Sequence, residues 1–177
     1  MSPITVMIAF YSIRGSTERL ATAAAVGAVQ GRARIRLRRM PDAGSLETKR
    51  GFPEFRESLE RMRKEYVGPT ESDVIASDAL VFGVPGEFAA ESGEWKAYLD
   101  VLARLGSQGK LRGKVGVALG SEPGLAAFSR AIAPLALAAP GLGASLAEEV
   151  PSDDVEHAIA LGRRVAAAAR SLIESTD

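Results

Sequence analysis

The chain alternates between short apolar runs and longer segments in which apolar residues recur at helical spacing. Residues 4–11, 79–84 and 115–119 are almost entirely apolar, which is typical of strands buried on both faces of a parallel sheet. Residues 33–40 alternate between arginine and apolar side chains, which predicts a half-exposed strand at a sheet edge. A weaker, final strand is predicted over residues 144–150.

Helical spacing separates these strands along the whole chain. The pattern predicts helices over residues 17–30, 53–66, 92–105, 125–138 and 155–172. Alternating strands and helices indicate an α/β fold with a doubly wound, five-stranded parallel sheet. Because the arginine-bearing strand belongs at an edge, we expect the strand order 2-1-3-4-5. We also expect a single domain that covers residues 1–177.

Composition excludes several classes of function. Lysine plus arginine and aspartate plus glutamate both number 22, so no global charge favours a nucleic acid or an anionic membrane. The chain has no cysteine and a single histidine, His157, so we expect no metal site, thiol nucleophile or serine–histidine triad. The N-terminus lacks the features of a signal peptide, and no apolar stretch reaches the ~20 residues of a membrane span. These features predict a cytoplasmic protein without a membrane partner.

Three loops follow the carboxyl ends of the first, third and fourth predicted strands, where doubly wound sheets bind their ligands. They comprise residues 12–17, 85–93 and 120–124. All three contain glycine, and the predicted strand order brings them together at one edge of the sheet. We therefore expect the ligand site there.

The first of these loops suggests an anion site. Ser12, Ser16 and Thr17 supply hydroxyl groups, and Gly15 permits a close approach of the backbone. The helix that follows adds free N–H groups and the positive end of its dipole, so a phosphate can bind without a lysine. The alternative is a simple turn at Gly15 with a helix N-cap at Ser16 or Thr17. The nucleotide fingerprints GxxxxGK[ST] and GxGxxG are absent.

Three segments of the chain resemble a known family. They are Tyr11-Ser12-x-x-Gly15, VFGVPGEFAAESGEWKAYLD at residues 81–100, and LRGKVGVALGS at residues 111–121. With these segments the chain resembles the flavodoxin-like fold, and specifically the WrbA family of NAD(P)H:quinone oxidoreductases, which bind FMN.

The resemblance implies which residues would contact FMN. The first loop would hold the phosphate through Ser12, Ile13, Arg14, Gly15, Ser16 and Thr17. The second would border the isoalloxazine ring through Pro85, Gly86, Glu87 and Phe88. The third would contact the pyrimidine side of the flavin or the ribityl chain through Ser121, Glu122 and Gly124.

The resemblance also implies an activity. It is an FMN-dependent transfer of electrons from NAD(P)H to a quinone-like acceptor, without a catalytic acid or base in the protein. Neighbouring subunits complete the active site in the family, so the resemblance implies a homo-oligomer, either a dimer or a tetramer.

Two departures from the family pattern leave alternatives open. Glu87 and Glu122 bring carboxylates into the expected pocket, where they would disfavour the anionic reduced flavin. A flavodoxin-like module with weak or lost FMN binding, acting in interaction or regulation, is therefore one alternative. A flavodoxin-type electron carrier is another, although zero net charge argues against the acidic docking face of such a carrier. A receiver domain needs acidic residues where Tyr11 and Ser12 stand, and is excluded.

Other conspicuous side chains have simpler interpretations. Arg14 either pairs with a phosphate or pyridine nucleotide, or is a solvated loop residue. The alternating arginines of residues 33–40 are expected to protect an edge strand from aggregation rather than to bind NADPH. Trp95 and Tyr98 share one face of their predicted helix, which places them in the core.

Overall fold

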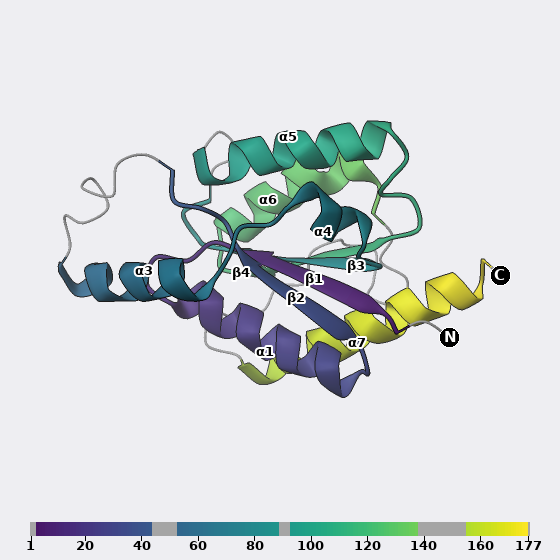
Figure 1. Ribbon diagram of the computed structural model, residues 1–177, viewed down its shortest axis with the longest axis horizontal. Helices are drawn as coiled ribbons and strands as arrows, with labels where there is room; N and C mark the ends of the chain where they lie inside the picture. Colours follow the sequence, from purple (N-terminus) through teal and green to yellow (C-terminus); the bar gives the residue numbers. More distant parts are fainter. Residues whose placement is uncertain (1–2, 44–52, 89–92, 138–154, 177) are drawn as a thin grey trace.

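A computed structural model describes residues 3–43, 53–88, 93–137 and 155–176 of the chain (Figure 1). Four parallel strands form its sheet in the order β2-β1-β3-β4. They are β1 (Thr5–Phe10), β2 (Arg34–Arg39), β3 (Ala79–Val84) and β4 (Val115–Gly120). This order agrees with the predicted one and places the arginine-bearing strand at an edge. The predicted fifth strand, residues 144–150, lies outside the described residues.

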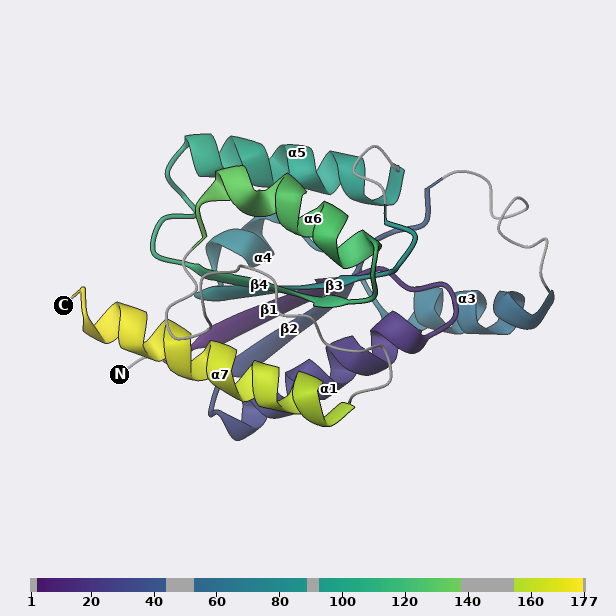
Figure 2. The same cartoon turned by 180° about the vertical axis from the view of Figure 1, so that it is seen from behind.

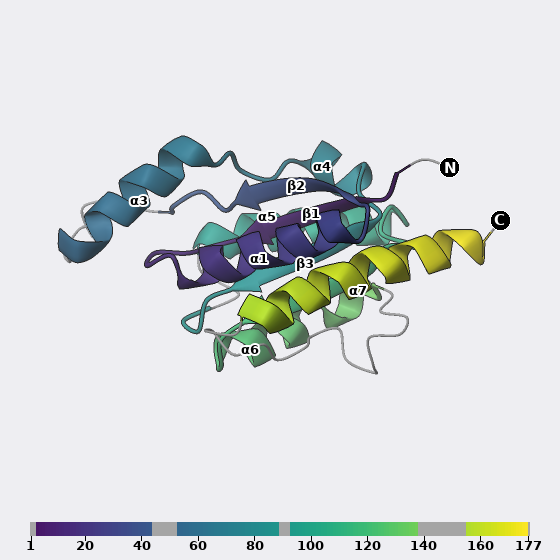
Figure 3. The same ribbon diagram turned by 90° about the horizontal axis from the view of Figure 1, so that it is seen from below.

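Helices cover both faces of the sheet, as a doubly wound fold requires (Figures 1 and 2). One face carries α1 (Ser16–Gln30) and α7 (Val155–Glu174). The other carries α4 (Glu71–Ile75), α5 (Gly93–Ser107) and α6 (Gly124–Ile132), which continues into a short 3₁₀ helix, η1 (Ala133–Leu135). The helix α3 (Pro53–Glu65) extends beyond the carboxyl ends of β1 and β2 (Figure 3).

The sheet separates two hydrophobic cores. Successive side chains of β1 point to opposite faces, so Ile8 packs with α1 and α7 while Met7 packs toward α5 and α6. Both are fully buried, which explains why the strand reads as a continuous apolar run. Trp95 and Tyr98 lie buried in the second core, so their predicted place is confirmed.

The contact between α1 and α7 depends on two glycines. A Cβ atom at Gly27 would overlap the Ile159 carbonyl of α7, and one at Gly162 would overlap the Ala24 carbonyl of α1. The two helix backbones therefore approach more closely than alanine would allow.

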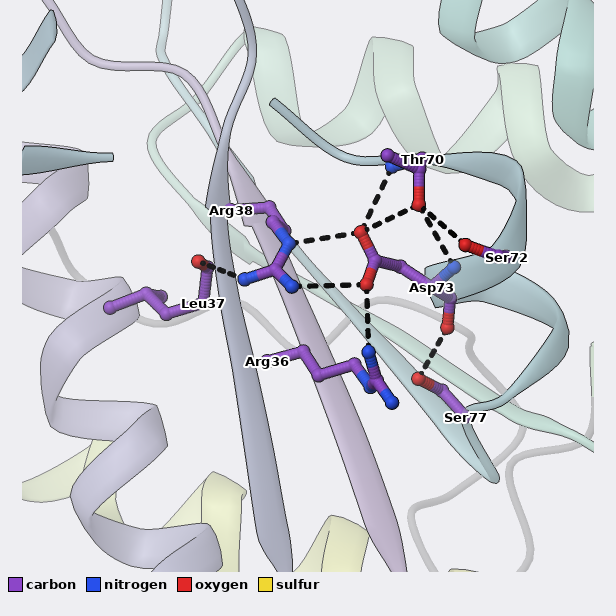
Figure 4. A network of polar contacts seen from close by, with 7 residues as sticks. All are labelled: Arg36, Leu37, Arg38, Thr70, Ser72, Asp73 and Ser77. Atoms are coloured by element: carbon purple, nitrogen blue, oxygen red, sulfur yellow. Dashed lines mark hydrogen bonds and ion pairs between the residues drawn. The ribbon is translucent and has the colours of Figure 1, made fainter. Parts of the chain in front are cut away.

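The helix α4 is anchored to the edge strand by a network around Asp73 (Figure 4). The Asp73 carboxylate accepts hydrogen bonds from Arg36 at 3.0 Å and Arg38 at 2.9 Å, and also from the backbone N–H and hydroxyl of Thr70. Thr70 in turn accepts the Asp73 N–H, which completes a capping box. Arg36 and Arg38 of the edge strand thus form ion pairs that hold α4 against β2.

Two elements differ from the sequence prediction. The helix α4 was not anticipated, because five residues are too few to show helical periodicity. The helix expected over residues 125–138 ends at Ile132, and Pro134 follows in the 3₁₀ turn. Within the described parts of the chain, no helix is both long enough and apolar enough to cross a membrane.

Candidate functional site

The loops after β1, β3 and β4 converge on a cavity at the carboxyl edge of the sheet. Its volume of about 460 Å³ lies within the range of roughly 300–1,000 Å³ that is usual for small-molecule sites. The described residues that line it are Ser12, Ile13, Arg14, Ser16, Thr17, Pro85, Gly86, Glu87 and Ser121.

Close backbone contacts hold these loops against one another. A Cβ atom at Gly124, the first residue of α6, would overlap the Pro85 carbonyl after β3. The methyl group of Thr17 lies 3.2 Å from where a Cβ of Gly83 would stand, so the start of α1 packs directly on β3. Glycine at these positions allows the three cavity walls to meet.

Gly15 shapes the first loop. Its φ of +96° lies in the left-handed region that favours glycine, and its N–H donates to the Ser12 Oγ at 3.0 Å. Gly15 is also the N-cap of α1, and no side chain among the described residues caps this helix. The alternative of an N-cap at Ser16 or Thr17 is therefore wrong.

The loop presents several unpaired donors. Within the described residues, no protein acceptor bonds the backbone N–H groups of Ile13, Arg14, Ser16, Thr17 and Glu18. The buried Thr17 and the exposed Ser16 line the cavity and carry hydroxyl groups in addition. Free N–H groups at a helix N-terminus attract an anion through hydrogen bonds and through the helix dipole.

The helix α3 flanks this loop and offsets a nearby negative charge. Glu18, in the first turn of α1, accepts hydrogen bonds from Arg61 of α3 at 2.6 Å and from the Tyr66 hydroxyl at 2.7 Å. The Arg61 guanidinium lowers the pKa of Glu18, while burial and the hydrogen bond to Glu18 raise that of Tyr66 to about 12. A second contact joins the loop to α3: the Arg14 guanidinium carbon lies 4.7 Å from the centre of the Phe55 ring.

Nine of the thirteen residues predicted for the site line the cavity, and four do not. Gly15 and Gly124 shape the walls through their backbones, as described above. The Phe88 ring is buried in the core, where its centroid lies 5.2 Å from that of Phe128. Glu122 is exposed, and its carboxylate accepts the Ala126 N–H of α6 at 3.2 Å.

Of the two acidic departures from the family pattern, only Glu87 lines the cavity. Its side chain is exposed, so solvent screens part of its charge.

Sequence reasoning missed a buried polar cluster behind the first loop. Arg39, the last residue of β2, donates to the Ser12 carbonyl at 3.0 Å and to Asp42 at 2.8 Å. The pattern held a signal: Arg39 follows Ile35 and Leu37 on the apolar side of the alternating strand, where a charge needs buried partners.

The fold and this site define a flavodoxin-like protein in which the loop after the first strand lines a cavity at the carboxyl edge of the sheet. The family model for NADPH-dependent FMN reductase matches residues 4–152, and the chain belongs to this family. A curated NAD(P)H dehydrogenase (quinone) from Archaeoglobus fulgidus is 36% identical over 120 residues, which are 66% of this chain and 61% of the relative. Another, NAD(P)H dehydrogenase (quinone) 3 from Rhizobium meliloti, is 33% identical over 112 residues, which are 62% of this chain and 49% of the relative. The chain thus spans about half to three-fifths of the length of these relatives.

Solved structures show the same fold. A WrbA-like flavodoxin protein from Agrobacterium tumefaciens matches with a TM-score of 0.64 at 22% identity, covering 95% of this chain and 98% of its own. The two-electron reduced flavodoxin of Megasphaera elsdenii matches with a TM-score of 0.62 at 18% identity, and the match covers 92% of this chain and 98% of the flavodoxin.

Proposed function

We propose that this chain is an FMN-dependent oxidoreductase that transfers electrons from NAD(P)H to a quinone-like acceptor. The observation that carries the proposal is the start of α1, where Ser16 and Thr17 line the cavity and their backbone N–H groups have no acceptor within the described residues. The family supports FMN and NADPH as the chemistry, and the names of the curated relatives support a quinone as acceptor.

The residues present fit FMN at this site. The N–H groups of Ile13, Arg14, Ser16 and Thr17, together with the Ser16 and Thr17 hydroxyls, would hold the phosphate. The Ser12 hydroxyl accepts from Gly15 and keeps its own hydrogen for a ligand. Pro85, Gly86 and Ser121 would border the flavin.

When bound, FMN supplies the hydride and electron transfer, so the chain needs no acid or base of its own. The work of the chain is to bind the cofactor, to orient it and to leave its redox face open to NAD(P)H and the acceptor. We also propose that the chain assembles as a homo-oligomer, which sedimentation velocity would test directly.

Glu87 favours a second candidate function. A carboxylate in the cavity wall opposes an anionic cofactor, which supports a flavodoxin-like module with weak or lost FMN binding. The two candidates differ in whether the purified chain binds FMN at all.

Titration of the purified chain with FMN decides between them. We expect saturable quenching of flavin fluorescence, a shifted visible spectrum, and NAD(P)H oxidation that depends on added FMN and a soluble quinone. If the chain is folded but does not quench flavin fluorescence, the oxidoreductase proposal is wrong. The second candidate, a flavodoxin-like module without FMN, would then be supported. Quenching without NAD(P)H oxidation would instead indicate an electron carrier.

A further inference from the structure

Arg39 is a buried cation at the junction of β2 and the first cavity loop. Its side chain is 3% exposed, and an arginine rarely takes such a position without specific partners. The guanidinium donates twice to Asp42, at 2.8 and 3.1 Å, and once to the Ser12 carbonyl at 3.0 Å. It therefore links the end of the edge strand to the first residue of the loop.

Tyr11, which directly follows the neighbouring strand β1, completes the cluster. Its ring centroid lies 5.2 Å from the Arg39 guanidinium carbon, and its hydroxyl donates to Asp42 at 3.0 Å. Burial and the Asp42 carboxylate raise the pKa of Tyr11 well above its ordinary value, so the hydroxyl stays protonated as a donor. Arg39, Asp42 and Tyr11 thus hold one another in fixed positions directly behind the loop.

This cluster sets the direction of one peptide group in the loop. The Ser12–Ile13 peptide is trans, so its carbonyl and its N–H point in opposite directions. Arg39 binds the carbonyl and does not line the cavity, whereas Ser12 and Ile13 do. The Ile13 N–H, which has no acceptor within the described residues, is accordingly turned away from the interior.

We propose that Arg39 is a positioning residue that fixes this peptide and thereby selects a phosphorylated flavin over its dephosphorylated form. The proposal rests on the FMN function proposed above. It differs from a general role in stability, because Arg39 acts on the part of the loop that would meet the phosphate. The isoalloxazine ring would meet the loops after β3 and β4. The hydrogen bonds of Arg39 go to Asp42 and Ser12 and not to either of those loops.

The test compares Arg39→Gln and Arg39→Lys with the wild type. Each is titrated with FMN and riboflavin by fluorescence quenching, and with inorganic phosphate by calorimetry. We expect Arg39→Gln to weaken FMN and phosphate binding by about tenfold and to leave riboflavin binding within about twofold. Arg39→Lys keeps the charge but loses the planar fork that joins Asp42 to Ser12, so we expect an intermediate loss. Arg34→Gln, an exposed position on the same strand, should match the wild type.

Each outcome bears on the proposal. If Arg39→Gln weakens FMN and riboflavin binding by the same factor, the ratio of the two affinities is unchanged. This result would overturn the proposal in favour of a purely structural role for Arg39. If Arg39→Gln does not fold, the Arg39→Lys ratio decides. If the wild type binds phosphate but no FMN, the FMN function fails, and the loss of phosphate binding in the variants still tests Arg39. If the wild type binds neither, both proposals fail.

Discussion

Glu87 and Glu122 are both acidic residues in loops that were expected to contact the flavin, but their surroundings differ. Glu87 lines the cavity, whereas the Glu122 carboxylate accepts the Ala126 N–H at the start of α6. Sequence alone could not separate them, because the difference depends on where α6 begins relative to the loop. The hydrogen bond from Ala126 holds the Glu122 carboxylate at the first turn of α6, and Glu122 does not line the cavity.

These positions give a matched pair of substitutions. Glu87→Gln should tighten FMN binding about three- to tenfold, because it removes a partly screened negative charge from the cavity wall. Glu122→Gln keeps an acceptor for Ala126 and should leave the affinity unchanged. Fluorescence-quenching titrations of both variants measure the effect. Equal responses of the two variants would show that Glu87 exerts no specific influence on the ligand.

The character of the first loop could be predicted from its residues. The buried cluster of Arg39 and Asp42 that contacts the loop could not. Ser12, Gly15 and Thr17 are residue types that suggest a phosphate loop after a strand, and the structure places their loop on the cavity. Arg39 and Asp42 come from another strand and the segment after it, so only the fold brings them behind Ser12. Contacts of this kind are set by topology, which local patterns do not encode.

Among the elements, β1, β3 and β4 were predictable as continuous apolar runs, because strands buried on both faces need no polar side chains. The edge strand β2 and the long helices were predictable from the period of their apolar residues. The exceptions have physical reasons. The helix α4 is a single short turn whose one sequence signal is the capping box Thr70-x-x-Asp73. The small-residue segment after α6 has weak periodicity, so Pro134 was a better guide to the helix end than its apolar pattern.

The packing of α1 on α7 predicts an unusual response to alanine. Gly→Ala within a helix normally stabilises it by up to about 1 kcal/mol. Gly27→Ala should instead lower the free energy of unfolding by about 1–3 kcal/mol, because the new methyl group would overlap the Ile159 backbone of α7. Gly106→Ala in α5 is the control, since its nearest neighbours are side-chain carbons at 3.6 Å. Urea denaturation of both variants should show opposite signs; a stabilised Gly27→Ala would contradict the close contact.

The contact between β2 and α4 predicts an acid-sensitive contribution to stability. Hydrogen bonds from Arg38 and Thr70 lower the pKa of Asp73 well below its ordinary value of 3.8. A lowered folded-state pKa stabilises the fold above the unfolded pKa, and this contribution is lost as the pH falls below about 4. Asp73→Asn should therefore cost about 1–3 kcal/mol at pH 7 and progressively less at lower pH.

The control for Asp73 is Asp100→Asn, which removes a surface carboxylate that is 68% exposed and paired with Lys96. It should change the free energy of unfolding by less than about 0.5 kcal/mol at any pH. Urea denaturation from pH 3 to pH 7 measures both variants. A loss for Asp73→Asn that is the same at every pH would show that the ionised carboxylate is not what anchors α4.

At the scale of the whole molecule, the cavity lies where three loops from different strands meet, so a bound ligand must couple to the stability of the entire fold. A ligand that binds only the folded state at 100 times its dissociation constant adds about 2.7 kcal/mol to the free energy of unfolding. For a chain of 177 residues each kilocalorie raises the Tm by roughly 2–4 °C. Saturating FMN should therefore raise the Tm by about 5–10 °C.

The same measurement on Gly15→Val connects this global effect to the loop. A β-branched residue is strained at the φ of +96°, so the variant should lose the ordered N–H groups that meet the phosphate. Its far-UV dichroism should stay close to that of the wild type, because the substitution lies outside the helix and its Cβ has only an ordinary 3.6 Å contact with Glu18. We expect FMN to raise the Tm of the wild type and to leave that of Gly15→Val nearly unchanged. An equal rise in both proteins would place the phosphate site elsewhere in the molecule.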